Sequence, residues 1–164
     1  MPTAIELTKR ATVERLPRDW REELELVRKI NSQYSVYREG TWCFLIDTTR
    51  NTVAVQCPLT KRRRMGTVCY HPEYTVTNMR YRGKGLAVQL YRELLRWGAV
   101  LVSGDQQSVG SQRLWGKLCA DRQITVWAYN AAEGWDQCVQ DEEGIPDCSW
   151  AVYERPTQLF AQWG

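Results

Sequence analysis

Residues 73–97, EYTVTNMRYRGKGLAVQLYRELLRW, decide the fold of this chain. The β-branched and aromatic residues of 73–79 predict a half-buried strand. Apolar residues at helical spacing predict a helix over 86–97. The inner face of this helix would be formed by Leu86, Leu90, Leu94 and Trp97. Its other face would carry Gln89, Arg92, Glu93 and Arg96.

A glycine turn, Arg82-Gly83-Lys84-Gly85-Leu86-Ala87, joins the predicted strand to the helix. Glycine lets the backbone approach a ligand closely, and the unpaired amides of a helix N-terminus favour anions. The turn therefore predicts an anion site, although glycines that serve turn geometry alone are the alternative. A dinucleotide-binding fingerprint fits less well, because Val88 stands where its third glycine belongs. The Walker pattern is absent.

The composition is that of one ordinary domain over residues 1–164, with a net charge of +3. No apolar run approaches the ~20 residues of a membrane helix. The N-terminus lacks the apolar core of a signal peptide, so we expect a cytoplasmic protein without membrane contact. The basic cluster Lys61-Arg62-Arg63-Arg64 could meet nucleic acid or cofactor phosphates. A solvated loop is the simpler interpretation.

The six cysteines include no C-x-x-C pair, so we expect no metal site and reduced, mostly buried thiols. His71 is the only histidine, and no nucleophile motif surrounds any serine. Hydrolytic Ser-His or Cys-His chemistry is therefore set aside.

The remaining elements follow from periodicity and turn residues. Helices are expected over 20–30 and 108–119, with Trp115 in the core. Strands are expected over 5–7, 41–46, 52–56, 67–70, 99–102, 124–129 and 149–154. Irregular segments are expected over 31–40, 61–66 and 130–146, with Pro58 ending the second hairpin strand. This order predicts an α/β (α+β) protein with a mixed, mostly antiparallel sheet and helices on both faces.

The glycine turn resembles a motif of the GNAT superfamily of N-acetyltransferases. Arg82-x-x-Gly85-x-Ala87 matches its Q/R-x-x-G-x-G/A pattern. A second family signature, N-x-x-A-x-x-x-Y, is similar in spacing to Ser108-x-x-Ser111-x-x-x-Trp115. Trp115 offers no ionisable hydroxyl there, which puts retained catalysis in doubt. The resemblance implies a single GNAT-like domain whose cofactor-binding core spans about 73–118.

Residues 103–118, SGDQQSVGSQRLWGKL, also resemble acetyltransferase-like proteins of tailed bacteriophages. For a phage-encoded protein the location would be the host cytoplasm. The resemblance implies transfer of an acetyl or other acyl group from acetyl-CoA, as co-substrate, to an amine of a small molecule or protein.

The family pattern implies the following site. Cofactor-binding residues would be Val76, Thr77 and Asn78 along the pantetheine arm, then Arg82, Gly83, Lys84, Gly85, Leu86 and Ala87 at the pyrophosphate, with Ser108 on the later helix. Candidate general bases are Glu73, His71 and Asp105. Their alternatives are an exposed edge charge, a turn residue and a turn or cap former, respectively.

The acceptor cannot be read from the sequence. The acidic segment 136–147 could attract a cationic amine, or be a solvated loop. Trp127, Trp135 and Trp150 could line an acceptor groove, a protein interface or the core. The rival hypothesis is a catalytically degenerate phage protein of this fold that acts by protein–protein interaction, as a host-factor inhibitor or assembly component, and a homo-oligomer is also open. Nucleic-acid binding through 61–64 is a third, weaker hypothesis.

Overall fold

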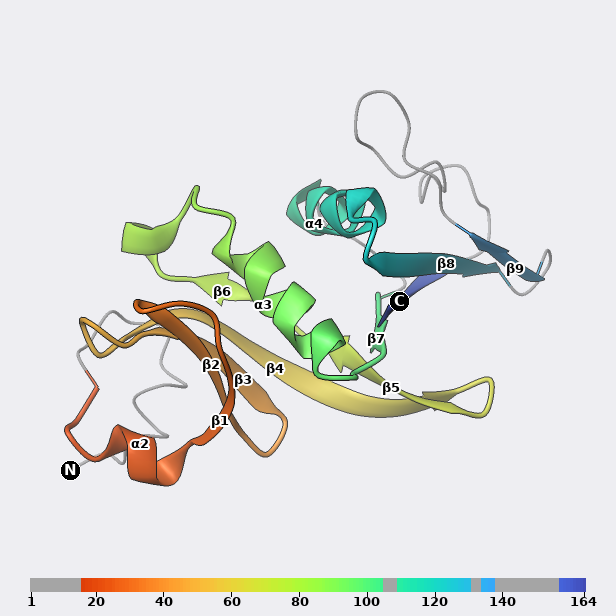
Figure 1. Ribbon diagram of the computed structural model, residues 1–164. Coiled ribbons are helices and arrows are strands. Elements are labelled where there is room, and N and C mark those ends of the chain that lie inside the picture. The colour runs from red at the N-terminus through yellow and green to blue at the C-terminus, as the bar shows by residue number, and fades with distance from the viewer. Residues whose placement is uncertain (1–15, 105–108, 131–133, 138–156) are drawn as a thin grey trace. The chain divides into compact units, whose positions relative to one another are not determined.

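The computed structural model describes residues 16–104, 109–130, 134–137 and 157–164 (Figure 1). These residues form an α+β protein with a mixed β-sheet and few helices. The chain divides into two compact units, one of Met1–Thr60 and Glu73–Glu93, the other of Lys61–Pro72 and Leu94–Gly164. The single domain expected from chain length stays a prediction.

The first unit is built on an antiparallel meander. A short helix, α2 (Trp20–Glu23), precedes β1 (Glu25–Lys29), β2 (Tyr34–Glu39), β3 (Trp42–Asp47) and β4 (Thr52–Arg64), each strand pairing with the next. The hairpin of β3 and β4 was predicted. One core cluster of this unit consists of Leu16, Trp20, Leu24, Tyr37, Phe44 and Ile46.

The predicted helix over 20–30 and the irregular segment over 31–40 are both wrong. Leu24 has extended backbone angles, φ −111° and ψ 141°, and ends α2 after one turn. The chain then enters β1, whose partner β2 occupies most of the supposed irregular segment. Backbone pairing across the hairpin, with an Arg38–Glu25 ion pair at 2.8 Å, overrides local helix propensity.

Strand β4 does not end at Pro58 but continues to Arg64, so that the whole strand is 13 residues long. Proline removes one N–H, but its carbonyl accepts from the Glu73 amide at 3.0 Å and the Leu59 amide donates to Thr41 at 2.8 Å. The loop expected over 61–66 is therefore wrong, because its basic residues belong to a strand. Only Met65 and Gly66 form the turn to β5 (Thr67–Pro72).

The central stretch folds as strand, turn and helix, with a shorter strand than predicted. Only β6 (Val76–Thr77) is strand, paired with Gln56 and Val55 of β4, and Met79–Tyr81 form the 3₁₀ helix η1. Helix α3 (Leu86–Arg96) confirms the predicted helix.

The faces of α3 differ from the prediction at two places. Leu86, Leu90 and Leu94 are buried as expected, whereas Trp97 is half exposed. Glu93, expected outside, is 4% exposed, because it pairs with Arg28 at 2.7 Å and accepts from Gln89 at 2.8 Å.

The second unit holds the parallel pair of the sheet. β5 pairs in parallel with β7 (Leu101–Val102), and antiparallel pairs join β7 to β10 (Thr157–Trp163), β10 to β8 (Ile124–Asn130) and β8 to β9 (Gly134–Gln137). Helix α4 (Val109–Ala120) packs against β8 (Figure 1), with Trp115 and Leu118 buried as predicted.

Two strands of this unit were not predicted. β9 lies within the segment expected to be a long loop, and β10 follows the last predicted strand. The strands predicted over 5–7 and 149–154 lie outside the described residues. Within the described ranges, none of the helices is both long and apolar enough to cross a membrane.

We expect Phe44→Ala to lower the free energy of unfolding by about 3–5 kcal/mol, because Phe44 is fully buried in the core cluster of the first unit. The control is Leu26→Ala on β1, where the side chain is 53% exposed and the loss should be about 0.5 kcal/mol or less. Urea unfolding followed by circular dichroism measures both. Equal losses would contradict this assignment of the core.

Candidate functional site

The glycine turn presents its backbone to solvent at the start of α3. Residues 82–85 are all exposed, and Gly83 and Gly85 have φ of +78° and +71°. A Cβ at either glycine would meet no atom within 4 Å, so the backbone conformation, and not crowding, requires glycine here. The first N–H groups of α3 have no partner within the helix and can receive an anion.

The 3₁₀ helix η1 is anchored at its first residue by Asn78, which is 6% exposed. The Asn78 amide donates to Ala54 at 2.9 Å, and its side chain donates to the Val53 carbonyl at 3.2 Å. The side-chain oxygen accepts from the Arg80 amide at 3.0 Å and caps η1. Asn78, predicted to line the pantetheine arm, thus fixes the approach to the glycine turn.

At the other end of η1, the buried Tyr81 hydroxyl donates to the Asp47 carboxylate at 2.7 Å. Asp47, at the end of β3, also accepts from Gln33 at 3.1 Å and from the amide and hydroxyl of Thr49 at 3.1 and 2.7 Å. The Arg50 amide adds a bond of 3.2 Å. This carboxylate ties the β3–β4 hairpin to the residue directly before the glycine turn.

Burial and hydrogen bonding act in opposite directions on Asp47. Burial alone would raise its pKa, but the hydrogen bonds from Thr49, Tyr81, Gln33 and the Arg50 backbone prevail, and the pKa lies below its usual value. Burial, together with the Asp47 charge that accepts its hydrogen bond, raises the pKa of Tyr81 to about 12. The pair therefore keeps a fixed donor and a fixed acceptor at neutral pH.

Two cationic side chains flank the turn. The Arg82 Nε donates to the Thr77 carbonyl at 3.4 Å, and the Lys84 ammonium lies 5.5 Å from the centre of the Tyr81 ring. Both side chains are exposed. They add positive charge beside the helix N-terminus, where the dipole already favours an anion.

The other predicted cofactor residues belong to the same unit. Val76 and Thr77 on β6 are half-buried, as is Ala87, while Leu86 is buried. Behind them, the Thr75 hydroxyl lies 2.8 Å from the Tyr91 hydroxyl and 3.5 Å from the Cys57 sulfur. The Leu86 side chain is thus buried, while the exposed backbone of residues 82–85 is left for a ligand.

The candidate bases are distributed over both units. Glu73 is exposed in the first unit and accepts a hydrogen bond from the Thr60 hydroxyl. His71 belongs to the second unit, as do Ser111 and Trp115, and its Nδ1 lies 3.1 Å from the Val102 carbonyl. Asp105 and Ser108 lie outside the described residues. Among the residues that the structure describes, no group of three or more His, Cys, Asp or Glu side chains could hold a metal ion.

The residues that sequence reasoning missed are Asp47 and Tyr81. An Asp followed by Thr-Thr-Arg is a signal for an Asx-type turn, and the Thr49 and Arg50 amides bear this out. No pattern in the sequence predicts the hydrogen bond between Asp47 and Tyr81, which are 34 residues apart.

Comparisons with protein-family models, with curated proteins and with solved structures find no match to this chain.

We expect Asp47→Asn to lower the free energy of unfolding at pH 7 by about 1–3 kcal/mol, because it weakens hydrogen bonds to a buried charged acceptor. The folded-state pKa is lowered, so this stabilisation is present above the ordinary value of about 3.9 and is lost as pH falls through the folded-state pKa. Urea unfolding at several pH values measures both effects.

In these titrations the parent protein should lose stability below about pH 4, and Asp47→Asn should lack part of that loss. The matched control is Asp19→Asn, whose exposed side chain makes no capping hydrogen bond. If the parent and Asp47→Asn showed the same acid dependence, the hydrogen-bonded carboxylate would not have the stabilising role assigned to it.

Proposed function

We propose that the chain is an acyl-CoA-dependent N-acyltransferase of the GNAT type, acting on an amine acceptor in the cytoplasm of the cell that contains it. The observation that carries the proposal is the exposed turn with two positive-φ glycines at the start of α3, flanked by Arg82 and Lys84. Main-chain amides, a helix dipole and two cations together suit a pyrophosphate.

In this proposal the pyrophosphate of acetyl-CoA binds the backbone from Arg82 to Ala87. The pantetheine arm follows the half-buried β6, past Val76 and Thr77. The anchoring of η1 through Asn78 and Tyr81 supports this arrangement, because a preorganised turn loses little conformational entropy when the cofactor binds. The finer architecture, with helices on both faces of the sheet, belongs to the same proposal.

The chemistry is the transfer of an acyl group to nitrogen. A neutral amine attacks the thioester carbonyl carbon, a C–N bond forms, and the C–S bond breaks to release the CoA thiolate. The amine proton passes to a base or to water, and the thiolate takes up a proton. Most of the acceleration would come from holding both substrates together, so a strong base is not obligatory. Glu73, His71 and Asp105 remain the candidates for that base.

We expect Gly85→Glu to abolish acetyl-CoA binding, because the new carboxylate would stand at the phosphate site and repel it. The matched control is Gly40→Glu, which introduces the same residue at another exposed, positive-φ glycine of the same unit, in the β2–β3 turn. Both variants place a side chain at a positive-φ position, +71° and +57°, and make the same charge change. Isothermal titration calorimetry with acetyl-CoA, free CoA and ATP measures binding.

One-to-one micromolar binding to the parent and to Gly40→Glu, absent in Gly85→Glu and not reproduced by ATP, would support the cofactor site. Equal binding by both variants would rule out the turn as the phosphate cradle. Failure of the parent protein to bind acetyl-CoA would overturn the enzyme proposal and favour a protein that acts through a protein partner.

A further inference from the structure

The basic end of β4 presents its four cations on two opposite faces. Side chains of a strand alternate, so Arg62 and Arg64 share one face while Lys61 and Arg63 share the other. The burial follows this alternation: both residues of the first pair are half-buried and both of the second are exposed. All four belong to the second unit.

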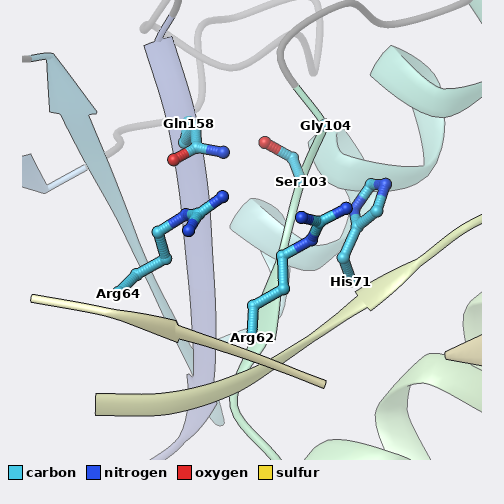
Figure 2. A pocket seen from close by; sticks show the side chains of 6 residues that line it. All are labelled: Arg62, Arg64, His71, Ser103, Gly104 and Gln158. Atoms are coloured by element: carbon cyan, nitrogen blue, oxygen red, sulfur yellow. The ribbon is translucent and has the colours of Figure 1, made fainter. Parts of the chain in front are cut away.

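The face with Arg62 and Arg64 borders a hollow of about 180 Å³. Its other lining residues come from three further parts of the second unit: His71 from β5, Ser103 and Gly104 after β7, and Gln158 from β10. Figure 2 shows the two guanidinium groups extending from β4 toward Ser103 and Gln158, with the His71 ring beside Arg62. None of the six lining residues carries a carboxylate.

The polar groups of this hollow are held by the surrounding strands. Ser103 is 2% exposed, and its Oγ accepts from the Leu159 amide at 2.8 Å, so its O–H remains a donor. The Val102 carbonyl can only accept, so the His71 Nδ1 carries the proton of their 3.1 Å hydrogen bond. This bond fixes the orientation of the imidazole ring.

A small apolar cluster is buried in the same unit as the hollow. Cys69, Val102 and Phe160 form a buried cluster in the same unit. Burial raises the pKa of the Cys69 thiol, and the charges of Arg64 and Arg62 oppose that rise. The charges of both guanidinium groups thus reach Cys69, which lies on the same strand as His71.

We propose that this hollow binds a compact tetrahedral oxyanion, either inorganic phosphate or the phosphate of a small monoester. Two planar guanidinium forks match phosphate oxygens in a bidentate way, and the serine hydroxyl and glutamine amide supply further donors. The volume is below the 300–1,000 Å³ of pockets that enclose drug-sized ligands, which favours a small anion or a single head group.

A compact anion also suits the site better than a nucleic-acid strand. A polyanion would draw on all four cations of 61–64, whereas the strand directs only two of them into the hollow. The inference goes beyond the proposed acyl transfer and does not depend on it, because Arg62, Arg64, Ser103 and Gln158 have no part in that reaction and, of the lining residues, only His71 is among its candidate bases.

The alternation gives an internally controlled experiment with four substitutions of equal charge. We expect Arg62→Gln and Arg64→Gln each to weaken binding of inorganic phosphate by roughly 10- to 100-fold. Lys61→Gln and Arg63→Gln, on the opposite face, should each change it by less than about 3-fold. Calorimetric titration with inorganic phosphate and phosphoserine separates the free ion from a monoester, with chloride at the same ionic strength as control.

Loss confined to the variants at 62 and 64 would establish the site. Equal loss in all four variants, or salt-dependent binding of an oligonucleotide that all four weaken alike, would overturn it in favour of a diffuse basic surface. Absence of phosphate and phosphoserine binding by the parent protein would also overturn it. Arg62→Lys and Arg64→Lys keep the positive charge and are less disruptive substitutions. Their thermal unfolding is compared with that of the parent, so that a loss of binding is not mistaken for a loss of folding.

Discussion

The alternation of side chains along one strand, β4, is the constraint on which both units depend. β4 passes through both as 13 uninterrupted residues. Over 54–59 every residue is buried, and beyond Thr60 burial alternates with period two. Its register is fixed by antiparallel pairing with β3, including Cys43 opposite Cys57. A slip of one residue would exchange the faces of the strand and turn Lys61 and Arg63 toward the hollow in place of the two arginines.

A second constraint is the burial of the Asp47 carboxylate, whose charge is compensated by hydrogen bonds and which holds the residue directly before the glycine turn. A carboxylate moved from water into a protein interior is costly unless its oxygens are satisfied. Asp47 meets this requirement with donors from its own hairpin and one, Tyr81, from η1. Because the Tyr81 hydroxyl stays protonated, the bond persists across the neutral range and holds η1 against the meander. The geometry of an exposed, glycine-containing turn is thus determined by buried groups that a ligand would not touch.

Much of the fold could be predicted from the sequence where one period dominated. Helices α3 and α4 and the β3–β4 hairpin carry clear apolar periodicity, and the structure confirms them. β1 and β2 were missed because the sequence of 20–30 favours a helix and that of 31–40 an irregular segment, and only the pairing between the two strands decides the structure. β10 was missed although it lies between β7 and β8 in the sheet, since its partners are distant in sequence.

At the sites, too, local features could be predicted and contacts between distant residues could not. The glycine turn could be predicted because φ values of +71° and +78° strongly favour glycine, which is visible in the sequence. The bond between Asp47 and Tyr81 joins residues far apart and leaves no comparable mark. The run 61–64 was interpreted as a loop because four consecutive cations show no alternation in residue type. Only the strand, once observed, divides them into two pairs with different surroundings.

The two anion sites inferred here rely on different donors, and this has consequences for selectivity. In the proposed function the glycine turn offers backbone amides and a helix dipole, which would bind a pyrophosphate with little help from side chains. The hollow offers guanidinium forks of Arg62 and Arg64, whose directional bonds distinguish a tetrahedral anion from a simple halide. Binding at the glycine turn would depend on backbone conformation and would be most sensitive to an added Cβ. Binding in the hollow would depend on charge and would be most sensitive to the loss of an arginine. Backbone and side-chain recognition can therefore be altered separately in one chain, since the residues responsible do not overlap.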